Sequence, residues 1–254
     1  MEKRGLAILS QTLTLEVLGP YGALLVYEGA SAIDQAGYIQ SMTTILIEAN
    51  INIIYSSTFT SDLILCPQSQ LQEAYDHIIS GFDDVGHLRL GNSHVKEAYT
   101  GLAPKVEDGT GILQGPAVVS PVANGLRIVS VKRSTMESLM HAICRVLFFD
   151  NAPTDFISVT MTDDEVSLVG FKSALSTLPA DIIEENSRSW SALQLTAGFG
   201  SSMVWSASDC LARANISIYY LSSSHDDYIL IPEGNRVDAL HCFENLGCNV
   251  SISP

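Results

Sequence analysis

The chain has 254 residues, of which 46% are hydrophobic and 16% charged, and its formal net charge is −15. This composition is that of a globular protein with roughly one to three domains. The acidity argues against a surface for nucleic acid or an anionic membrane, which would require lysine and arginine. The five cysteines lack zinc-binding spacing, and no apolar run reaches the ~18 residues of a membrane span. We therefore expect a cytoplasmic protein without metal or cofactor.

The first part of the chain predicts a small α+β unit. Apolar periodicities of two and of three to four residues alternate along it and predict, in order, a strand, a helix, two strands and a second helix, at residues 21–26, 38–48, 51–55, 62–65 and 71–82. Asn50 is expected to end the first helix, because asparagine tolerates the left-handed conformation. Pro67 is expected to end the last strand, because proline cannot donate to the ladder.

The next segment, residues 86–124, is rich in Gly, Pro, Ser and Asn and reads mostly as a flexible, exposed linker. Another unit follows this linker. Its pattern predicts a strand, a helix and a hairpin, at residues 126–131, 135–149, 156–161 and 165–169.

The last part of the chain repeats the first. Residues 49–67 and 214–232 align without a gap at an offset of 165, with 10 of 19 positions identical, and a strand at 190–195 matches the one at 21–26. Such self-similarity indicates two copies of one supersecondary unit, and a ligand site or pseudo-twofold interface often lies between such copies. Three units of this order predict a ferredoxin-like α+β architecture, with antiparallel sheets and helices on one face.

The stretches that carry a resemblance to a known family are the two repeated segments, WSALQLTAGFGSSMV, LRIVSVKRSTMESLMHAICRVLFF and FISVTMTDDEVSLVGF. They resemble the ACT domain family of small-molecule-binding regulatory modules, and their order resembles the CASTOR-like group of cytosolic arginine sensors. That group is built of four ACT units (βαββαβ). The resemblance implies that residues 1–85, 125–189 and 190–254 correspond to the second, third and fourth units, and that the first unit is missing here.

The resemblance also implies a ligand site between the second and fourth units. Carried over by alignment, the site residues come from a strand, a loop with the helix that follows it, and a turn: Asn52, Ile53, Gly200, Ser201, Ser202, Met203, Ser223, Ser224 and Asp227. This chain has glycine and serine in the loop where the family has a glutamate before a Cys-Gly pair. A different amino acid is therefore as suitable a ligand as arginine.

The chemistry of these residues suits an amino acid. A loop of small residues before a helix lets backbone N–H groups and the positive helix end approach a carboxylate. Asp227 can accept hydrogen bonds from a cationic group, and a guanidinium fits it best. Two plainer alternatives stay open. Asp227, like Asp62 in the first copy, could bond only its own turn, and the glycines could serve only the loop.

No nucleophile, phosphate-binding or metalloprotease motif is present, so we expect no enzymatic activity. The expected function is a sensor whose ligand shifts the population of its conformations and so alters a surface seen by a protein partner. The resemblance implies a partner in TORC1 signalling and a homodimer through the helix Thr135–Phe149. Two alternatives are a regulatory subunit of an amino-acid biosynthetic enzyme and a ligand-free interaction scaffold.

Overall fold

The computed structural model describes residues 21–27, 36–81, 117–149, 156–162, 164–180, 188–196, 201–223 and 226–251. The first copy contains β1 (Tyr21–Tyr27), α1 (Tyr38–Glu48), β2 (Ile54–Ser57), β3 (Ser61–Pro67) and α2 (Leu71–Gly81). The middle unit contains β4 (Val118–Lys132), α3 (Met136–Phe148), β5 (Ile157–Met161), β6 (Glu165–Phe171) and α4 (Lys172–Leu175). The second copy contains β7 (Trp190–Thr196), α5 (Ser201–Arg213), β8 (Tyr219–Ser222), β9 (Asp227–Pro232), α6 (Arg236–Asn245) and β10 (Asn249–Val250).

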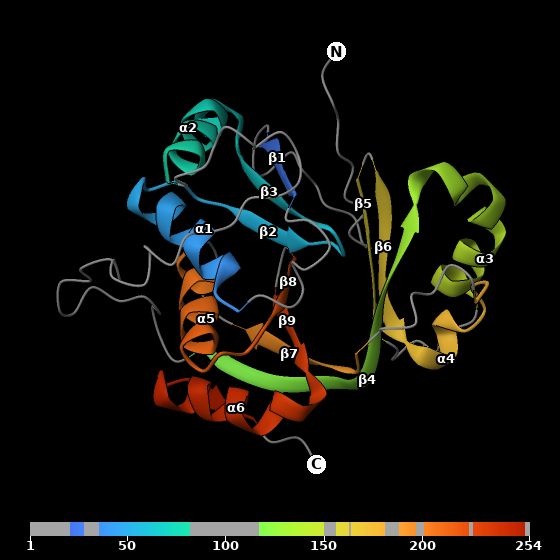
Figure 1. The fold of residues 1–254 in the computed structure, drawn as a ribbon. Helices are drawn as coiled ribbons and strands as arrows, with labels where there is room; N and C mark the ends of the chain where they lie inside the picture. The colour runs from blue at the N-terminus through green and yellow to red at the C-terminus, as the bar shows by residue number, and fades with distance from the viewer. Residues whose placement is uncertain are drawn as a thin grey trace.

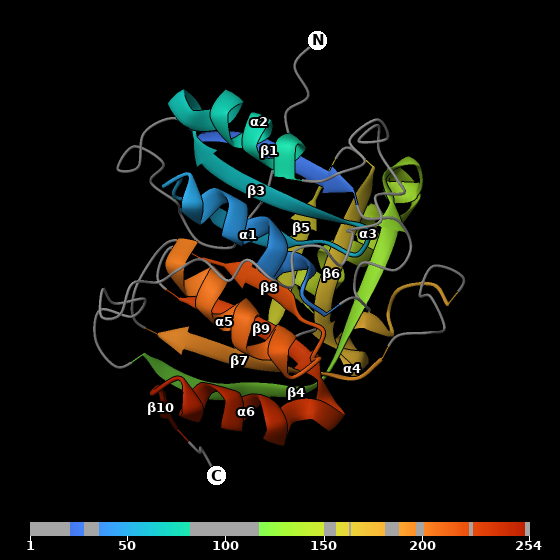
Figure 2. The ribbon, with the colours of Figure 1, turned by 60° about the vertical axis from the view of Figure 1, so that its left-hand side comes forward.

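The strands join into one sheet in the order β1-β3-β2-β8-β9-β7-β4-β6-β5, with β10 paired to β4. Helices α1, α2, α5 and α6 lie side by side over one face of the part from β1 to β7 (Figure 2). The sheet turns at β4, so that β5 and β6 stand beside the paired copies, with α3 and α4 on their outer side (Figure 1). The predicted α+β class with an antiparallel sheet and helices is confirmed.

Three buried clusters hold these layers together. The largest lies between the four helices and the sheet and includes Ile53, Tyr55, Met203 and Tyr220. A second lies on the opposite face, where Tyr219 and its neighbours meet aromatic residues of the middle unit. A third packs α3 and α4 on β4 and β6. Apolar residues on both faces of the central strands explain why these strands read as nearly continuous hydrophobic runs.

The two copies end their first helices in the same way. Asn50 and Asn215 adopt φ values of 55° and 56°, in the left-handed region. After each asparagine, a backbone N–H bonds back into the helix, from Ile51 to Leu46 O and from Ile216 to Leu211 O, both at 2.9 Å. The predicted role of asparagine at this position is confirmed.

A pseudo-twofold axis relates the copies. β2 pairs with β8 in antiparallel fashion, and Ser56 lies opposite Leu221, its own equivalent at the offset of 165. The hydrogen bonds beside this pair are reciprocal: Tyr55 N donates to Ser222 Oγ at 3.2 Å and Tyr220 N to Ser57 Oγ at 3.1 Å. The copies thus form an internal dimer, joined edge to edge through β2 and β8.

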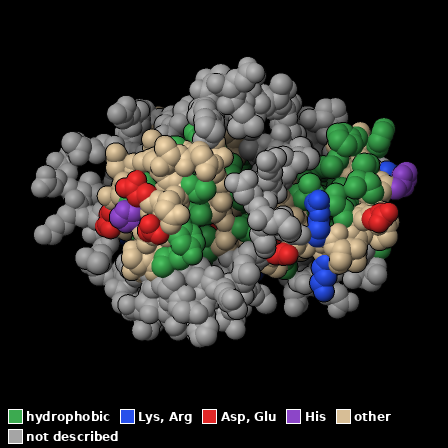
Figure 3. All heavy atoms as spheres, turned by 90° about the horizontal axis from the view of Figure 1, so that it is seen from above, with side chains coloured by type: hydrophobic (Ala, Val, Ile, Leu, Met, Phe, Trp, Pro, Cys, Tyr) green, Lys and Arg blue, Asp and Glu red, His purple; other side chains and the backbone are tan. Residues whose placement is uncertain are grey.

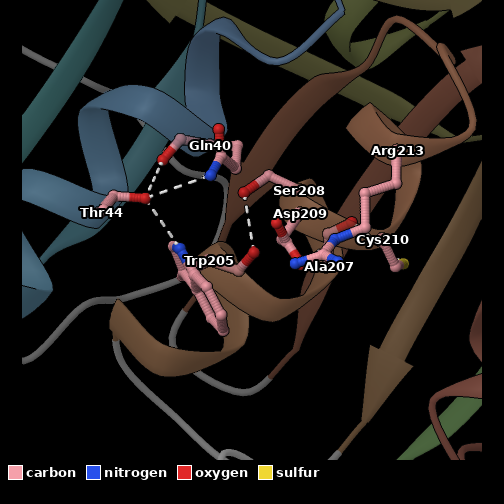
Figure 4. Close-up of polar contacts among 8 residues, drawn as sticks. All are labelled: Gln40, Thr44, Trp205, Ala207, Ser208, Asp209, Cys210 and Arg213. Carbon is pink, nitrogen blue, oxygen red and sulfur yellow. Dashed lines mark hydrogen bonds and ion pairs between the residues drawn. The ribbon is translucent and has the colours of Figure 1, made fainter. Parts of the chain in front are cut away.

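The helices repeat this contact above the sheet, where α1 packs on α5. Trp205 Nε1 donates to Thr44 Oγ1 at 2.8 Å, and Gln40 Nε2 approaches the same oxygen at 3.3 Å (Figure 4). This buried bond fixes the lateral position of one helix against the other, because the indole N–H would otherwise lose its partner on burial.

The end of the predicted linker is a strand. Residues 118–124 form the first half of β4, with Ala117 and Val119 fully buried, whereas residues 86–116 lie outside the described part of the chain. The Gly- and Pro-rich composition of this segment predicts a loop rather than a strand. In the structure, the pairing of β4 with β7 shifts register after Pro121 and again before Leu126. Such irregular places tolerate proline and a left-handed glycine, and Gly125 has φ 72°.

Candidate ligand site between the two copies

Asp227 begins β9, with Leu195 of β7 opposite it on one side and Ser222 of β8 on the other. Its side chain faces the helices, because Leu195, its cross-strand neighbour, belongs to the core beneath them. Asp227 is only 8% exposed, and the hydroxyl of Tyr220 donates to its Oδ2 at 2.9 Å.

This environment changes the acidity of the carboxyl group. Burial raises the pKa of Asp227 from 3.8 to about 6, while the hydrogen bonds from Tyr220 and Ser222 oppose the rise and the charge of Asp226 adds to it. Burial, followed by the nearby Asp227 charge, raises the pKa of Tyr220 well above its usual range. Tyr220 therefore keeps its proton near neutral pH and remains a donor to Asp227.

The site is built directly on the joint between the copies. Ser222 accepts the Tyr55 N–H from the first copy and also bonds Asp227, so one hydroxyl links β2 to the carboxylate. Above it, the rings of Tyr55 and Tyr220 meet edge to face, with centroids 6.3 Å apart. A change in the position of β2 relative to β8 would therefore alter the surroundings of Asp227.

The turn before β9 uses its own polar groups. Ser223 N and Oγ both donate to Asp226 O, at 3.0 and 2.6 Å, and Asp226 N donates to Ser223 Oγ at 3.1 Å. Thr58 and Ser61 make the same bonds in the first copy. The turn is therefore closed by the Ser223 hydroxyl and backbone. The Asp227 carboxylate accepts the Tyr220 hydroxyl instead.

The structure separates the residues predicted for the site. Ile53 and Met203 are buried in the same helix-side cluster, while Asn52 is exposed. Asn52 and Ile53 were expected on a strand, but β2 begins only at Ile54. Ser201 and Ser202 open α5, and their side chains, like residues Gly200 and Ser224, lie outside the described part.

Sequence reasoning missed Tyr220 and Ser222 as the partners of Asp227. A signal was present, because both copies carry tyrosine at 55 and 220 and serine at 57 and 222. Apolar strand patterns assign tyrosine to a core, and its hydroxyl bond depends on the pairing of β8 with β9, which a pattern does not specify.

The site combines features that suit a zwitterion. β7 ends beside Asp227, since Leu195 pairs with Asp227, and α5 starts at Ser201 soon after β7 ends. The positive end of α5 and the Asp227 carboxylate therefore lie at the same end of the sheet. Within the described residues, no group of three or more His, Cys, Asp and Glu side chains could hold a metal ion. Among the described helices, none has the length and hydropathy that crossing a bilayer requires.

Comparison with known families agrees with this geometry. The model of the ACT domain matches residues 21–78 and 186–245, which are the two copies. Both copies are therefore similar to the ACT domain. The chain is 23% identical over 243 residues to the cytosolic arginine sensor for mTORC1 subunit 1 of Bos taurus, an alignment that spans 87% of this chain and 71% of that protein. This similarity supports a CASTOR-like ACT protein.

Two solved structures are similar to this chain only at low identity and low TM-score. A protein from Agobacterium tumefaciens is 19% identical, covers 55% of this chain and 96% of its own, and has a TM-score of 0.41. The aspartate kinase of Synechocystis is 14% identical, covers 92% of this chain and 41% of its own, and has a TM-score of 0.37.

Proposed function

We propose that this protein is a non-enzymatic sensor that binds an amino acid between its two ACT copies and regulates a protein partner. The observation that carries the proposal is the position of Asp227. Its carboxylate is buried on the helix side of the sheet, beside the joint of β2 and β8 and at the end where α5 begins. Asp227 would accept the cationic group of the ligand, and backbone N–H groups at the start of α5 would receive its carboxylate.

Binding at this joint offers a mechanism of regulation. A ligand held by both copies favours the arrangement in which it makes all its contacts, and it shifts the population only as far as its affinities for the arrangements differ. The similarity to an arginine sensor for mTORC1 supports a cationic amino acid as the ligand, a partner in TORC1 signalling and a cytoplasmic location.

A homodimer through α3 belongs to the same proposal. Met140 and Phe148 lie two turns apart on its outer side, and Phe148 and Phe149 are 70% and 77% exposed. Figure 3 shows hydrophobic side chains gathered with basic ones on the side of α3. An apolar surface of this kind on an acidic protein favours contact with a second copy. Light scattering of the purified chain and of Phe148→Ser tests this: the variant is expected to be monomeric.

The ligand test compares two neighbouring carboxylates. Thermal unfolding is measured with each of the common amino acids at millimolar concentration, because a ligand that binds the native state raises the midpoint. We expect one amino acid to raise it, Asp227→Asn to abolish the rise and Asp226→Asn to preserve it. Asp226 is a matched control, because its carboxylate bonds Gln194 of β7 at 2.9 Å and its removal takes away the same charge. A folded protein that responds to no amino acid would refute the proposal and favour a ligand-free scaffold.

A further inference from the structure

The middle unit contacts both copies at the back of their joint, on the sheet face opposite the helices (Figure 1). Its strands β5 and β6 pair so that Thr160 and Ser167 lie directly opposite each other. Thr160 Oγ1 shares a hydrogen bond with Ser56 Oγ of β2 at 3.3 Å, and Ser167 Oγ shares one with the Tyr219 hydroxyl of β8 at 3.0 Å. A single cross-strand pair of the middle unit therefore bonds both strands of the joint.

These four hydroxyl groups are shielded from water. None of the side chains of Ser56, Thr160, Ser167 and Tyr219 is more than 6% exposed. A buried hydroxyl that loses its partner keeps the cost of its desolvation, because no water replaces the lost bond. A displacement of β2 relative to β8 therefore breaks at least one of these two bonds, unless the middle unit deforms with it.

Further contacts attach each copy to the same β5–β6 hairpin. On the first copy, the N–H of Thr60, in the turn between β2 and β3, donates to Glu165 Oε1 at 3.0 Å, while Ser130 of β4 donates to Oε2. On the second copy, the rings of Phe156 and Tyr228 meet edge to face, with centroids 5.3 Å apart. Glu165 lies beside the turn of the hairpin and Phe156 at its open end, so the hairpin reaches from one copy to the other across the joint.

The strands held in this way carry the candidate ligand site on their other face. Tyr219 and Tyr220 are neighbours on β8, and successive side chains of a strand point to opposite faces. The Tyr219 hydroxyl bonds Ser167 behind the sheet. The Tyr220 hydroxyl donates to Asp227 in front of it. Ser56 likewise lies between the two residues of β2 that bond β8 at the joint.

We propose that the β5–β6 hairpin is a brace that positions β2 against β8, with Thr160 and Ser167 as its positioning residues. The brace fixes the arrangement of the two copies in the absence of any ligand. It also links the joint to α3, because α3 packs on the other face of β6, against Val166 and Leu168. A change at the joint therefore reaches the α3 surface through one layer of packing. Only this last step rests on the proposed function.

The test is native-state hydrogen exchange of the full chain without ligand. It follows the amides of Tyr55 and Tyr220, which donate to serine hydroxyls across the joint, against the amides that pair β7 with β9. Thr160→Val and Ser167→Ala each remove one hydroxyl of the brace. We expect each variant to raise exchange at the two joint amides by about tenfold relative to the β7–β9 amides. The double variant should add little, because one broken contact already releases the joint.

The matched control is Thr43→Val. It removes a hydroxyl that is equally buried but bonds Ile39 O within α1, at 2.8 Å, and it should leave the relative exchange rates unchanged. Unchanged rates in a folded brace variant, or an equal rise in the control, would overturn the proposal. If a brace variant does not fold, Ser56→Ala and Tyr219→Phe remove the same two bonds from the other side and face the same criterion. The measurement uses no ligand, so it stands even if the amino-acid site fails.

Discussion

The clearest consequence of the structure is that the stability of the protein should depend on pH through Asp227. Burial raises the pKa of this carboxyl in the folded state to about 6, against 3.8 in the unfolded chain. Between these pH values the folded state binds the proton more tightly, so unfolding releases it and stability falls as pH rises. The difference between the folded-state and unfolded-state pKa, at about 1.4 kcal/mol per unit, corresponds to about 3 kcal/mol of folding stability. This stability is present at low pH and is lost by pH 7.

The perturbation that isolates this effect is Asp227→Asn. The amide oxygen can still accept the Tyr220 hydroxyl, while the side chain can no longer ionise. Urea unfolding of both proteins from pH 4 to pH 7.5 would give the difference in free energy at each pH, and all other titrating groups cancel. We expect the variant to gain on the wild type by about 3 kcal/mol over this range, with most of the change between pH 4 and pH 6. A difference that stays constant with pH, or that favours the wild type at high pH, would refute the reasoning.

Three further predictions concern the site and the joint. The affinity for a cationic amino acid should fall about tenfold per pH unit below pH 6, because a proton on Asp227 competes with the ligand. Calorimetry at pH 5 and pH 7 measures the affinity at each pH, and equal values would contradict the prediction. Ser57→Ala and Ser222→Ala should each destabilise the protein by about 1–3 kcal/mol, since each leaves a buried N–H of the paired strand unsatisfied; Ser80→Ala, at an exposed serine, is the control in urea unfolding. Asn215→Ala should destabilise by about 1 kcal/mol, with Asn215→Gly near neutral, because φ is positive there; equal unfolding midpoints for the two variants would count against this account.

The sequence alone predicts the elements whose signals are local. Periodicity locates the longer described helices but not the four-residue α4. The paired asparagines at 50 and 215 correctly mark the ends of α1 and α5, because a left-handed residue after a helix is decided by neighbours in the chain. The pairing of β2 with β8 joins residues 165 positions apart, and no local pattern specifies it. The first half of β4 was missed for a related reason, since its strand conformation depends on β7 and β10 rather than on its own Gly- and Pro-rich sequence.

The candidate site shows the same division. Asp227 was identified from family resemblance and from its place at a turn, and its burial depends on the sheet that forms around it. Its bond to Tyr220 requires β8 and β9 to pair in the correct register, and only the folded sheet shows this register. Asp62 occupies the same place in the repeat, and its burial likewise depends on the folded sheet.

The internal pairing also has a kinetic and quantitative consequence. Two separate chains that join through such an edge must find each other, and the paired fraction then varies with protein concentration. Here the partners of β2 and β8 belong to one chain, so their encounter is intramolecular and their effective concentration is set by the connecting segment. The ligand concentration needed for a response would therefore not depend on the concentration of the protein. Each copy could also change its own surface while the covalent connection keeps it paired with the other copy.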